Sequence, residues 1–384
     1  MKKITLLLFS LLFIGGCSTI SHKNKEIQQF SKSLPEKITI GYIGPLTGDA
    51  TVYGENERDV IKFALEEIKK TKLPNTDIEV IYEDGGCNGK DAVSAAQKLV
   101  NVDQTKIILG GACSGETLAI APITEEKNIL LFSAFSSSPD IRFAGDYVFR
   151  NSPSDFEMAR DIAQAIIKDG RRKIAIITET TDFAKGIENN LLNELETNGI
   201  QIVAKEYYNS NDNDFRTQLT KIKAANPDAL FINPQSGKPA GLIAKQAFEL
   251  EIKSSLYGGN SFSDPQALNT AGVSVNGLKY IDAPGLSKDN IYAQTILSQY
   301  IKLYGKPASE WLIATRYDSM LLIADAIKYC NEINTDCIRD YLYNLDTYTG
   351  MAGTYSFDKY GDPVGLKYVV KEITDAENGI IKEL

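Results

Sequence analysis

The sequence has little histidine and little tryptophan, with one residue of each among 384. The histidine, His22, stands before residue 37, so the longer part of the chain has no imidazole for a Ser-His-Asp or Cys-His mechanism. Structural zinc sites often use Cys-x-x-Cys pairs, and no such pair occurs. We therefore predict a protein that is not an enzyme and that uses no metal and no cofactor. A hydrolase is the rival hypothesis from the enzyme class.

Clustered positive charge is also missing. The chain carries 41 Lys and Arg against 50 Asp and Glu, a net charge of −9. No stretch forms the basic stripe that a phosphate backbone requires, so we expect no nucleic-acid partner. The glycine-rich residues 85–90 do not form a nucleotide-binding loop, because Asp91 stands where a magnesium-binding Ser or Thr is needed.

Two further stretches also lack residues that the corresponding functional motifs require. Residues 110–115 miss both the dinucleotide fingerprint and the Gly-x-Ser-x-Gly elbow of serine hydrolases. Residues 209–214 alternate oxygen-bearing side chains but lack the glycine and the terminal glutamate of a calcium-binding loop. A solvated turn is the better interpretation of residues 209–214.

The N-terminus has the order of features of an export signal. Lys2 and Lys3 precede an apolar run over residues 6–14, shorter than the ~20 apolar residues of a membrane-spanning helix. Two glycines then lead directly to Cys17. This stretch resembles a bacterial lipobox, which implies that residues 1–16 are a signal peptide and that Cys17 becomes the lipidated first residue. The alternative is an uncleaved or buried helix.

Residues 17–36 are rich in Ser, Lys, Asn and Gln and poor in large apolar residues, so we predict a tether without a core. Residues 37–384 exceed the roughly 250–300 residues at which a single core stops growing, which predicts two domains. The expected location is outside the cytoplasm, facing the periplasm or cell exterior, with the chain anchored by its lipid.

Four cysteines remain beyond Cys17, an even number in an oxidising compartment. Three disulfide pairings are possible. The sequence separations favour Cys87 with Cys113 and Cys330 with Cys337, since each pair joins neighbouring elements. A zinc site is the alternative.

Short β-branched runs alternate with amphipathic stretches from residue 37 onward, which predicts an α/β fold with parallel sheets. The expected strands are 37–43, 77–82, 106–109, 129–133, 173–178, 200–207, 229–232 and 256–257. The expected helices are 56–70, 90–101, 116–126, 155–168, 186–198, 215–225, 240–250, 291–304 and 314–329.

Several stretches resemble the leucine/isoleucine/valine-binding branch of the type I periplasmic binding proteins. They include residues 40–48, 52–54, 82–87, 110–114, 170–173, 214–215, 226–229 and 357–358. The resemblance implies two doubly wound Rossmann-like lobes, joined by three hinge crossovers near Ser152, Ala283 and Tyr368. The first lobe would comprise residues 37–152 and 284–367, and the second residues 153–283 and 368–384. The resemblance also matches the pairing of Cys87 with Cys113.

The resemblance further implies a ligand site between the lobes. In the first lobe it assigns ligand contacts to Tyr53, Ser114, Phe135, Ser136 and Ser137. Hydroxyls and free backbone N–H groups could receive a ligand carboxylate there. The alternatives are that Ser114 and Ser137 are helix caps and that Tyr53 is a packing aromatic.

In the second lobe the resemblance assigns Phe183, Gln235 and Asn260 to the ligand site. The family's amino-acid binders carry a tyrosine and a glutamate where this chain has Gln235 and Asn260. The site therefore lacks the negative charge that would pair with the ammonium group of an amino-acid ligand. Asp182 or Asp264 could replace it. We therefore expect a carboxylate with an uncharged tail, or an amide, and weak binding of free leucine, isoleucine and valine.

The resulting hypothesis is a monomeric solute-binding lipoprotein that serves the permease of an ABC importer and holds a small amino-acid-like, carboxylate or amide solute. The alternative is a ligand-sensing or regulatory subunit of the same fold without a permease.

Overall fold

The computed structural model describes residues 34–283, 286–287 and 289–384. The expected signal peptide, the acylated Cys17 and the tether up to residue 33 lie outside these residues. Within the described part of the chain, no helix combines the length and apolar character needed to cross a bilayer.

The first sheet has five parallel strands in the order β2-β1-β3-β4-β5. A strand order of this kind is typical of doubly wound folds, in which helices cover both faces. Both faces are buried, since Tyr42 and Ile43 are adjacent on β1 and both are inaccessible to solvent. The strands are β1 Lys37–Gly44, β2 Asp77–Asp84, β3 Ile107–Leu109, β4 Leu130–Ser133 and β5 Val148–Arg150. The helices that follow them are α1 Thr51–Thr71, α2 Gly89–Asn101, α3 Ser114–Glu126 and the 3-10 helix η1 Pro139–Phe143.

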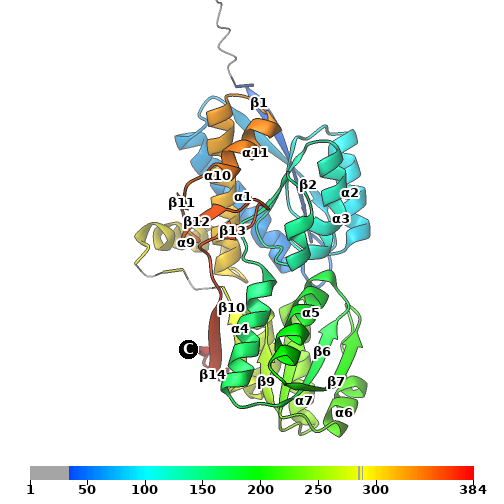
Figure 1. Ribbon diagram of the computed structural model, residues 1–384. Helices are drawn as coiled ribbons and strands as arrows, with labels where there is room; N and C mark the ends of the chain where they lie inside the picture. Colours follow the sequence, from blue (N-terminus) through cyan, green and yellow to red (C-terminus); the bar gives the residue numbers. More distant parts are fainter. Residues whose placement is uncertain (1–33, 284–285, 288) are drawn as a thin grey trace, which may run out of the picture. The chain divides into compact units, whose positions relative to one another are not determined.

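The second sheet has seven strands in the order β15-β14-β10-β9-β8-β6-β7 and is parallel from β7 to β10. These strands are β6 Lys173–Glu179, β7 Gln201–Tyr208, β8 Ala229–Asn233, β9 Ser255–Gly258, β10 Lys279–Asp282, β14 Val369–Asp375 and β15 Ile380–Glu383. Its helices are α4 Asp155–Lys168, α5 Asp182–Thr197, α6 Arg216–Ala224, α7 Gly237–Glu249 and α8 Pro265–Ala271, with the 3-10 helices η2 Asn260–Ser263 and η3 Gly272–Val275 (Figure 1).

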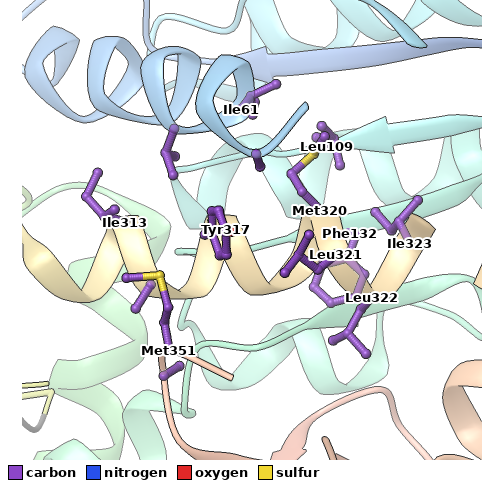
Figure 2. Packing of buried hydrophobic residues seen from close by; sticks show 14 of the residues in the cluster. Ile61, Leu109, Phe132, Ile313, Tyr317, Met320, Leu321, Leu322, Ile323 and Met351 are labelled. Carbon is purple, nitrogen blue, oxygen red and sulfur yellow. The ribbon is translucent and has the colours of Figure 1, made fainter. Parts of the chain in front are cut away.

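After β10 the chain returns to the first sheet through α9 Ile291–Tyr304, α10 Glu310–Cys330 and α11 Thr335–Tyr343. Helix α10 packs against α1, and Tyr317 and Met320 on α10 lie in the same core as Phe132 of β4 (Figure 2). A small antiparallel sheet follows, formed by β11 Tyr348–Thr349, β12 Thr354–Phe357 and β13 Pro363–Val364. We call the first sheet with α1–α3 and α9–α11 the first lobe, and the second sheet with α4–α8 the second lobe.

The chain passes between the two sheets three times, between β5 and α4, between β10 and α9, and between β13 and β14. An ion pair buried in the first lobe holds α10 to α1, where Arg316 Nη2 lies 2.8 Å from Glu57 Oε1. Tyr42 of β1 donates to the other carboxylate oxygen of Glu57 over 2.9 Å. These contacts explain why the long helices expected at 291–329 cover the first sheet, although they follow β10 of the second sheet in the sequence.

The structure differs from the sequence-based expectation in several details. Strands β5 and β10 to β13 and helices α8 and α11 were not among the expected elements, and α1 begins at Thr51 rather than at residue 56. Residues 34–36 were assigned to the tether, but Leu34 packs on the core of the first lobe and the carbonyl of Glu36 accepts from Asp77 N. The apolar side chain and the continuing strand ladder draw these residues into the fold. The C-terminal strands β14 and β15 were also missing from the expected strands, because β15 is exposed along its whole length and has no apolar alternation.

Candidate functional site

A small cavity is lined by residues of both lobes and by one residue from each of the three passages between them. The first lobe contributes Tyr53, Ala112, Ser114, Phe135, Ser137, Ser309 and Trp311, and the second contributes Phe183, Gln235, Asn260, Ser261, Ser263 and Asp282. The three passages contribute Ser152, Ala283 and Tyr368. Most of these residues follow the carboxyl end of a strand or begin a helix, which is where open α/β sheets bind ligands. The cavity measures about 30 Å³, so a solute of several heavy atoms requires its walls to move apart.

Seven of the eight expected contact residues line this cavity, namely Tyr53, Ser114, Phe135, Ser137, Phe183, Gln235 and Asn260. Ser136 does not. Its hydroxyl lies 2.7 Å from both Thr117 Oγ1 and the Gly111 carbonyl, and its N–H donates to Ser133 Oγ. Ser136 therefore fastens the loop after β4 to the loop after β3, which is a supporting role rather than a ligand contact.

Ser114 connects the two first-lobe loops at the cavity. Its hydroxyl oxygen accepts from the N–H groups of Ser137 and Ser138, at 3.3 and 3.1 Å. The hydroxyl proton is therefore left to donate to another acceptor. Ser114 is also the first residue of α3, where the helix N–H groups have no acceptor within the helix. The arrangement offers several donors to one acceptor group.

The structure does not support the alternative that Ser114 and Ser137 are helix caps. The N-cap of α3 is Cys113, and the residue that caps η1 is Ser138, whose hydroxyl accepts from Asp140 N. Phe183 lines the cavity, and its buried ring also belongs to the second-lobe core.

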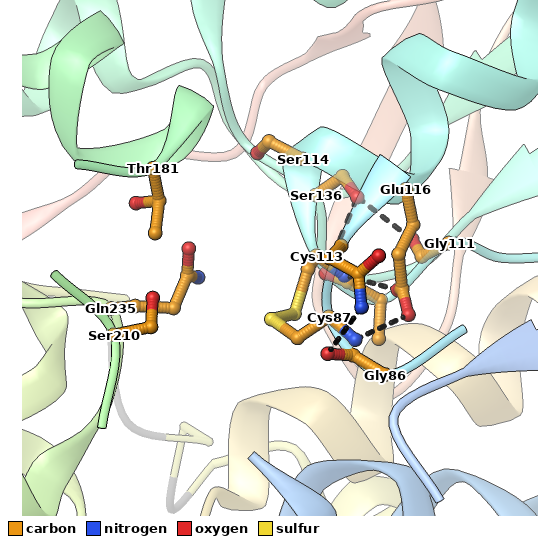
Figure 3. The surroundings of a disulfide bond; sticks show 12 residues. Gly86, Cys87, Gly111, Cys113, Ser114, Glu116, Ser136, Thr181, Ser210 and Gln235 are labelled. Atoms are coloured by element: carbon orange, nitrogen blue, oxygen red, sulfur yellow. Dashed lines mark hydrogen bonds between the residues drawn. A yellow bond between two sulfur atoms is a disulfide. The ribbon is translucent and has the colours of Figure 1, made fainter. Parts of the chain in front are cut away.

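The Cys87–Cys113 disulfide ends at the residue directly before Ser114 (Figure 3). Glu116 supports both of its ends, since Oε1 accepts from Cys87 N at 3.0 Å and Oε2 accepts from Cys113 N at 2.9 Å. Burial raises the pKa of Glu116 to about 8, although these N–H bonds oppose the shift. Cys330 and Cys337 form the second disulfide, so no thiolate among the four cysteines is left for zinc.

Tyr53 closes the cavity from the first lobe. Its ring packs against Phe135 with centroids 5.3 Å apart, and its hydroxyl donates to Asp264 Oδ2 of the second lobe over 3.0 Å. Burial, together with the carboxylate of Asp264, raises the pKa of Tyr53 well above its usual value. The tyrosine is thus a donor in a contact between the lobes rather than only a packing aromatic.

The second lobe contains a carboxylate that the sequence analysis missed. Asp282, the last residue of β10, lines the cavity and forms an ion pair with Lys371 Nζ at 2.7 Å. Burial raises its pKa. Of the two candidates considered as replacements, Asp264 is occupied by Tyr53, and Asp182 is exposed and does not line the cavity.

Other lining residues were also missed, namely Ser261, Ser263, Ser309 and Trp311. A usable signal existed for Asp282, because it directly precedes Ala283, where a passage between the lobes was expected. No comparable local signal marks Ser309 and Trp311, which reach the cavity only through the return of α10 to the first lobe.

The passages themselves are joined by hydrogen bonds. Tyr368 donates to the carbonyl of Pro153 over 2.8 Å and lies 3.4 Å from Asp155 Oδ1, while Asp155 N donates to the carbonyl of Ser137. Burial raises the pKa of Asp155 to about 7. Asp155 thus connects a cavity-lining loop of the first lobe with two of the passages.

A family model described as periplasmic binding protein matches residues 37–376 of this chain. The chain belongs to the periplasmic binding protein family. Within it the chain is a type I periplasmic binding protein of the leucine/isoleucine/valine-binding branch, as the resemblance of its motifs indicated. Its relatives are solute-binding proteins rather than enzymes.

This binding protein is 24% identical over 341 residues to a leucine-, isoleucine-, valine-, threonine- and alanine-binding protein of Pseudomonas aeruginosa, covering 88% of this chain and 90% of the relative. Its fold is similar to that of a leucine-binding protein from Thermotoga maritima, with 26% identity, a TM-score of 0.82 and coverage of 90% and 97%. A solute-binding protein of R. palustris in complex with benzoate has a TM-score of 0.81 at 18% identity, with coverage of 91% and 95%.

Proposed function

We propose that this chain is an extracytoplasmic solute-binding lipoprotein that delivers a small carboxylate or amide solute to an ABC importer. The observation that carries the proposal is the cavity lined by both lobes and by all three passages between them. A solute in such a cavity is held only when the lobes are closed, and it is released when they hinge apart. Residues 37–152 with 284–367 and residues 153–283 with 368–384 would be the two moving domains.

The head group of the solute would bind to the first lobe. Ser114 offers a hydroxyl donor, and the first turn of α3 offers backbone N–H groups. Donors at a helix N-terminus favour an anion. The Pseudomonas relative is named for amino acids and the R. palustris structure holds benzoate, and all of these molecules contain a carboxylate.

The remainder of the solute would carry no net charge. Gln235 and Asn260 face the cavity with neutral amides, and the charge of Asp282 is balanced by Lys371. A ligand ammonium would therefore meet an ion pair that is already formed, and burying a charge without a free partner costs several kcal/mol. Deaminated acids and amides should therefore bind more tightly than leucine, isoleucine and valine.

A thermal-shift panel followed by calorimetry tests the ligand class. The panel contains leucine, isoleucine, valine, their deaminated acids, their amides, urea and benzoate. A ligand at 100 times its Kd stabilises the protein by about 2.7 kcal/mol, which is readily seen as a rise in Tm. Carboxylates or amides should give this rise. Submicromolar leucine binding that requires the ammonium group would contradict the uncharged tail, and an absence of binding by every member would contradict the solute class.

The lipid anchor and the importer need separate tests. Two or three acyl chains at about 0.8 kcal/mol per buried methylene anchor a protein stably. Cys17→Ser should move the protein from the membrane fraction to the soluble fraction and remove the acyl mass. Deleting the gene should abolish uptake of the identified radiolabelled solute. Normal uptake without the protein would instead favour a sensing subunit.

A further inference from the structure

Helix α5 of the second lobe contains a glycine away from both of its ends. Gly186 lies inside α5, which runs from Asp182 to Thr197, and it is buried. A glycine in a helix interior destabilises the helix relative to alanine, because it loses more conformational freedom on folding. Helix stability therefore does not explain this residue, and its surroundings must.

The first lobe packs directly on this glycine. Helices α5 and η1 are in contact, and η1 begins with Pro139 after its cap Ser138. A Cβ atom on Gly186 would lie 3.1 Å from both Ser138 Oγ and Pro139 Cδ, which is shorter than nearly all Cβ contacts. A side chain at this position would therefore press against the first lobe.

The two residues that face Gly186 cannot easily move aside. Ser138 is fully buried, its hydroxyl accepts from Asp140 N, and its carbonyl accepts from Arg150 Nη1 over 2.7 Å. The ring of Pro139 is closed onto its own backbone and has no free side-chain rotation. Any residue larger than glycine would have to push α5 away from η1.

A second glycine makes the reciprocal contact. Gly115 follows the first residue of α3 in the first lobe, and a Cβ atom on it would lie 3.1 Å from Asp182 Oδ2 at the start of α5. Asp182 is exposed, so its side chain can turn away more readily than Pro139 can. Each lobe thus presents a glycine to the other, and the contact at Gly186 is the more rigid of the two.

This contact lies beside the cavity rather than in it. In the described part of the chain, the cavity lining includes neither glycine and neither Ser138 nor Pro139. It does include Ser114, directly before Gly115, and Phe183, which is on α5. The separation of α5 from the first lobe therefore sets the distance between cavity residues of the two lobes.

We propose that Gly186 controls solute affinity without touching the solute, because the absence of its side chain lets the two lobes close fully. The inference rests on the proposed function, since it assumes that the solute is held when the lobes close. A side chain at position 186 would act as a wedge in the closed form and would be relieved when the lobes hinge apart. Affinity should fall for this reason even where the fold is as stable as before.

Calorimetry on Gly186→Ala and Gly186→Leu tests the inference with every member of the thermal-shift panel that the wild type binds. Affinity should fall about three-fold for Ala and about ten-fold or more for Leu, since overpacking a close contact is unfavourable. Urea unfolding without solute should show Gly186→Ala to be at least as stable as the wild type, because alanine favours the helix. A residue with only a structural role would lose stability and affinity together.

Asn189→Leu is the matched control. Asn189 is exposed on the same helix. Its replacement should leave the Kd within about two-fold of the wild type, as expected for a surface substitution.

Spin labels on opposite lobes measure closure without any solute. The four cysteines beyond Cys17 form disulfides, so in a Cys17→Ser chain the labels attach only to thiols introduced by Val102→Cys and Phe248→Cys. Both positions are exposed, one on each lobe. Adding Gly186→Leu should shift the distance distribution measured by pulsed EPR away from that of the closed form, and adding Asn189→Leu should not.

The outcomes separate this inference from the proposed function. An unchanged affinity in folded Gly186→Leu would overturn the inference and leave the proposed function intact. Binding of no panel member to the folded wild type would overturn the proposed function, and in that case unchanged label distances would overturn the inference as well. If Gly186→Leu fails to fold by circular dichroism, Gly186→Ala carries the test, and a parallel loss of stability and affinity in that variant would contradict the inference.

Discussion

The hydroxyl of Tyr53 donates to Asp264 Oδ2 over 3.0 Å and so connects α1 of the first lobe with the N-cap of α8 in the second. Both side chains are buried. Asp264 Oδ1 also accepts from Gln266 N, which fixes the carboxylate at the start of its helix. If the lobes hinge apart as proposed, this hydrogen bond would break on opening, so it would contribute to the free energy of closure and thereby to solute affinity.

Replacing Tyr53 with Phe should weaken solute binding about ten-fold. The variant keeps the ring that packs on Phe135 but removes the donor, and an acceptor left unpaired in a buried position costs about 1–3 kcal/mol. Calorimetry measures the change in Kd. Tyr147→Phe is a matched control, because this buried tyrosine bonds to Asp336 and Arg339 within the first lobe. An unchanged Kd in Tyr53→Phe would contradict the role of the contact in closure.

Ser114 and Ser136 should respond differently to replacement by Ala. Ser114→Ala removes a cavity donor and the acceptor for two loop N–H groups, so the Kd should rise about ten- to a hundred-fold. Ser136→Ala should lower the free energy of unfolding by about 1–3 kcal/mol and change the Kd little, because its hydroxyl is used inside the protein. Urea unfolding and calorimetry separate the two effects. Equal losses of affinity would place Ser136 in the site after all.

The two disulfides give a second matched comparison. Replacing either cysteine pair with serines should destabilise the protein by roughly 2–4 kcal/mol, since each bond closes a loop in the unfolded chain. Only loss of Cys87–Cys113 should also weaken solute binding, because Cys113 directly precedes Ser114. Denaturant unfolding and calorimetry on both double variants check this. A similar loss of affinity without Cys330–Cys337 would show that the effect is one of general stability.

Asp155 should make stability depend on pH. Burial raises the pKa of its carboxyl to about 7 in the folded protein, while an unfolded aspartate titrates near pH ~4. The folded state therefore holds the proton more tightly. The stabilisation is complete below about pH 4 and is lost as the pH rises through about 7.

Asp155→Asn removes this titration. Over the same pH window, the unfolding free energy of the wild type should fall relative to that of the variant, as measured by urea unfolding at several pH values. Parallel curves for the two proteins would show that Asp155 is already ionised in the folded state.

Much of the backbone architecture was predictable from local sequence. The alternation of β-branched runs with amphipathic stretches reflects the periods of the strand and the helix, so the helix at 155–168 and the parallel strands follow from short windows. The strands β14 and β15 were not predicted. They pair antiparallel at the edge of the second sheet, and the exposure of β15 leaves no apolar alternation to detect.

The sequence by itself determined the two-lobed α/β fold, the even set of cysteines and most of the cavity residues that follow strand ends. Only the tertiary structure decided that Ser137 faces the cavity while Ser136 faces the protein interior, because neighbouring side chains point in different directions along an irregular loop. It also decided that Asp282 and Trp311 line the same cavity. Local sequence sets backbone periodicity, but which side chains meet depends on how α10 packs back on the first lobe.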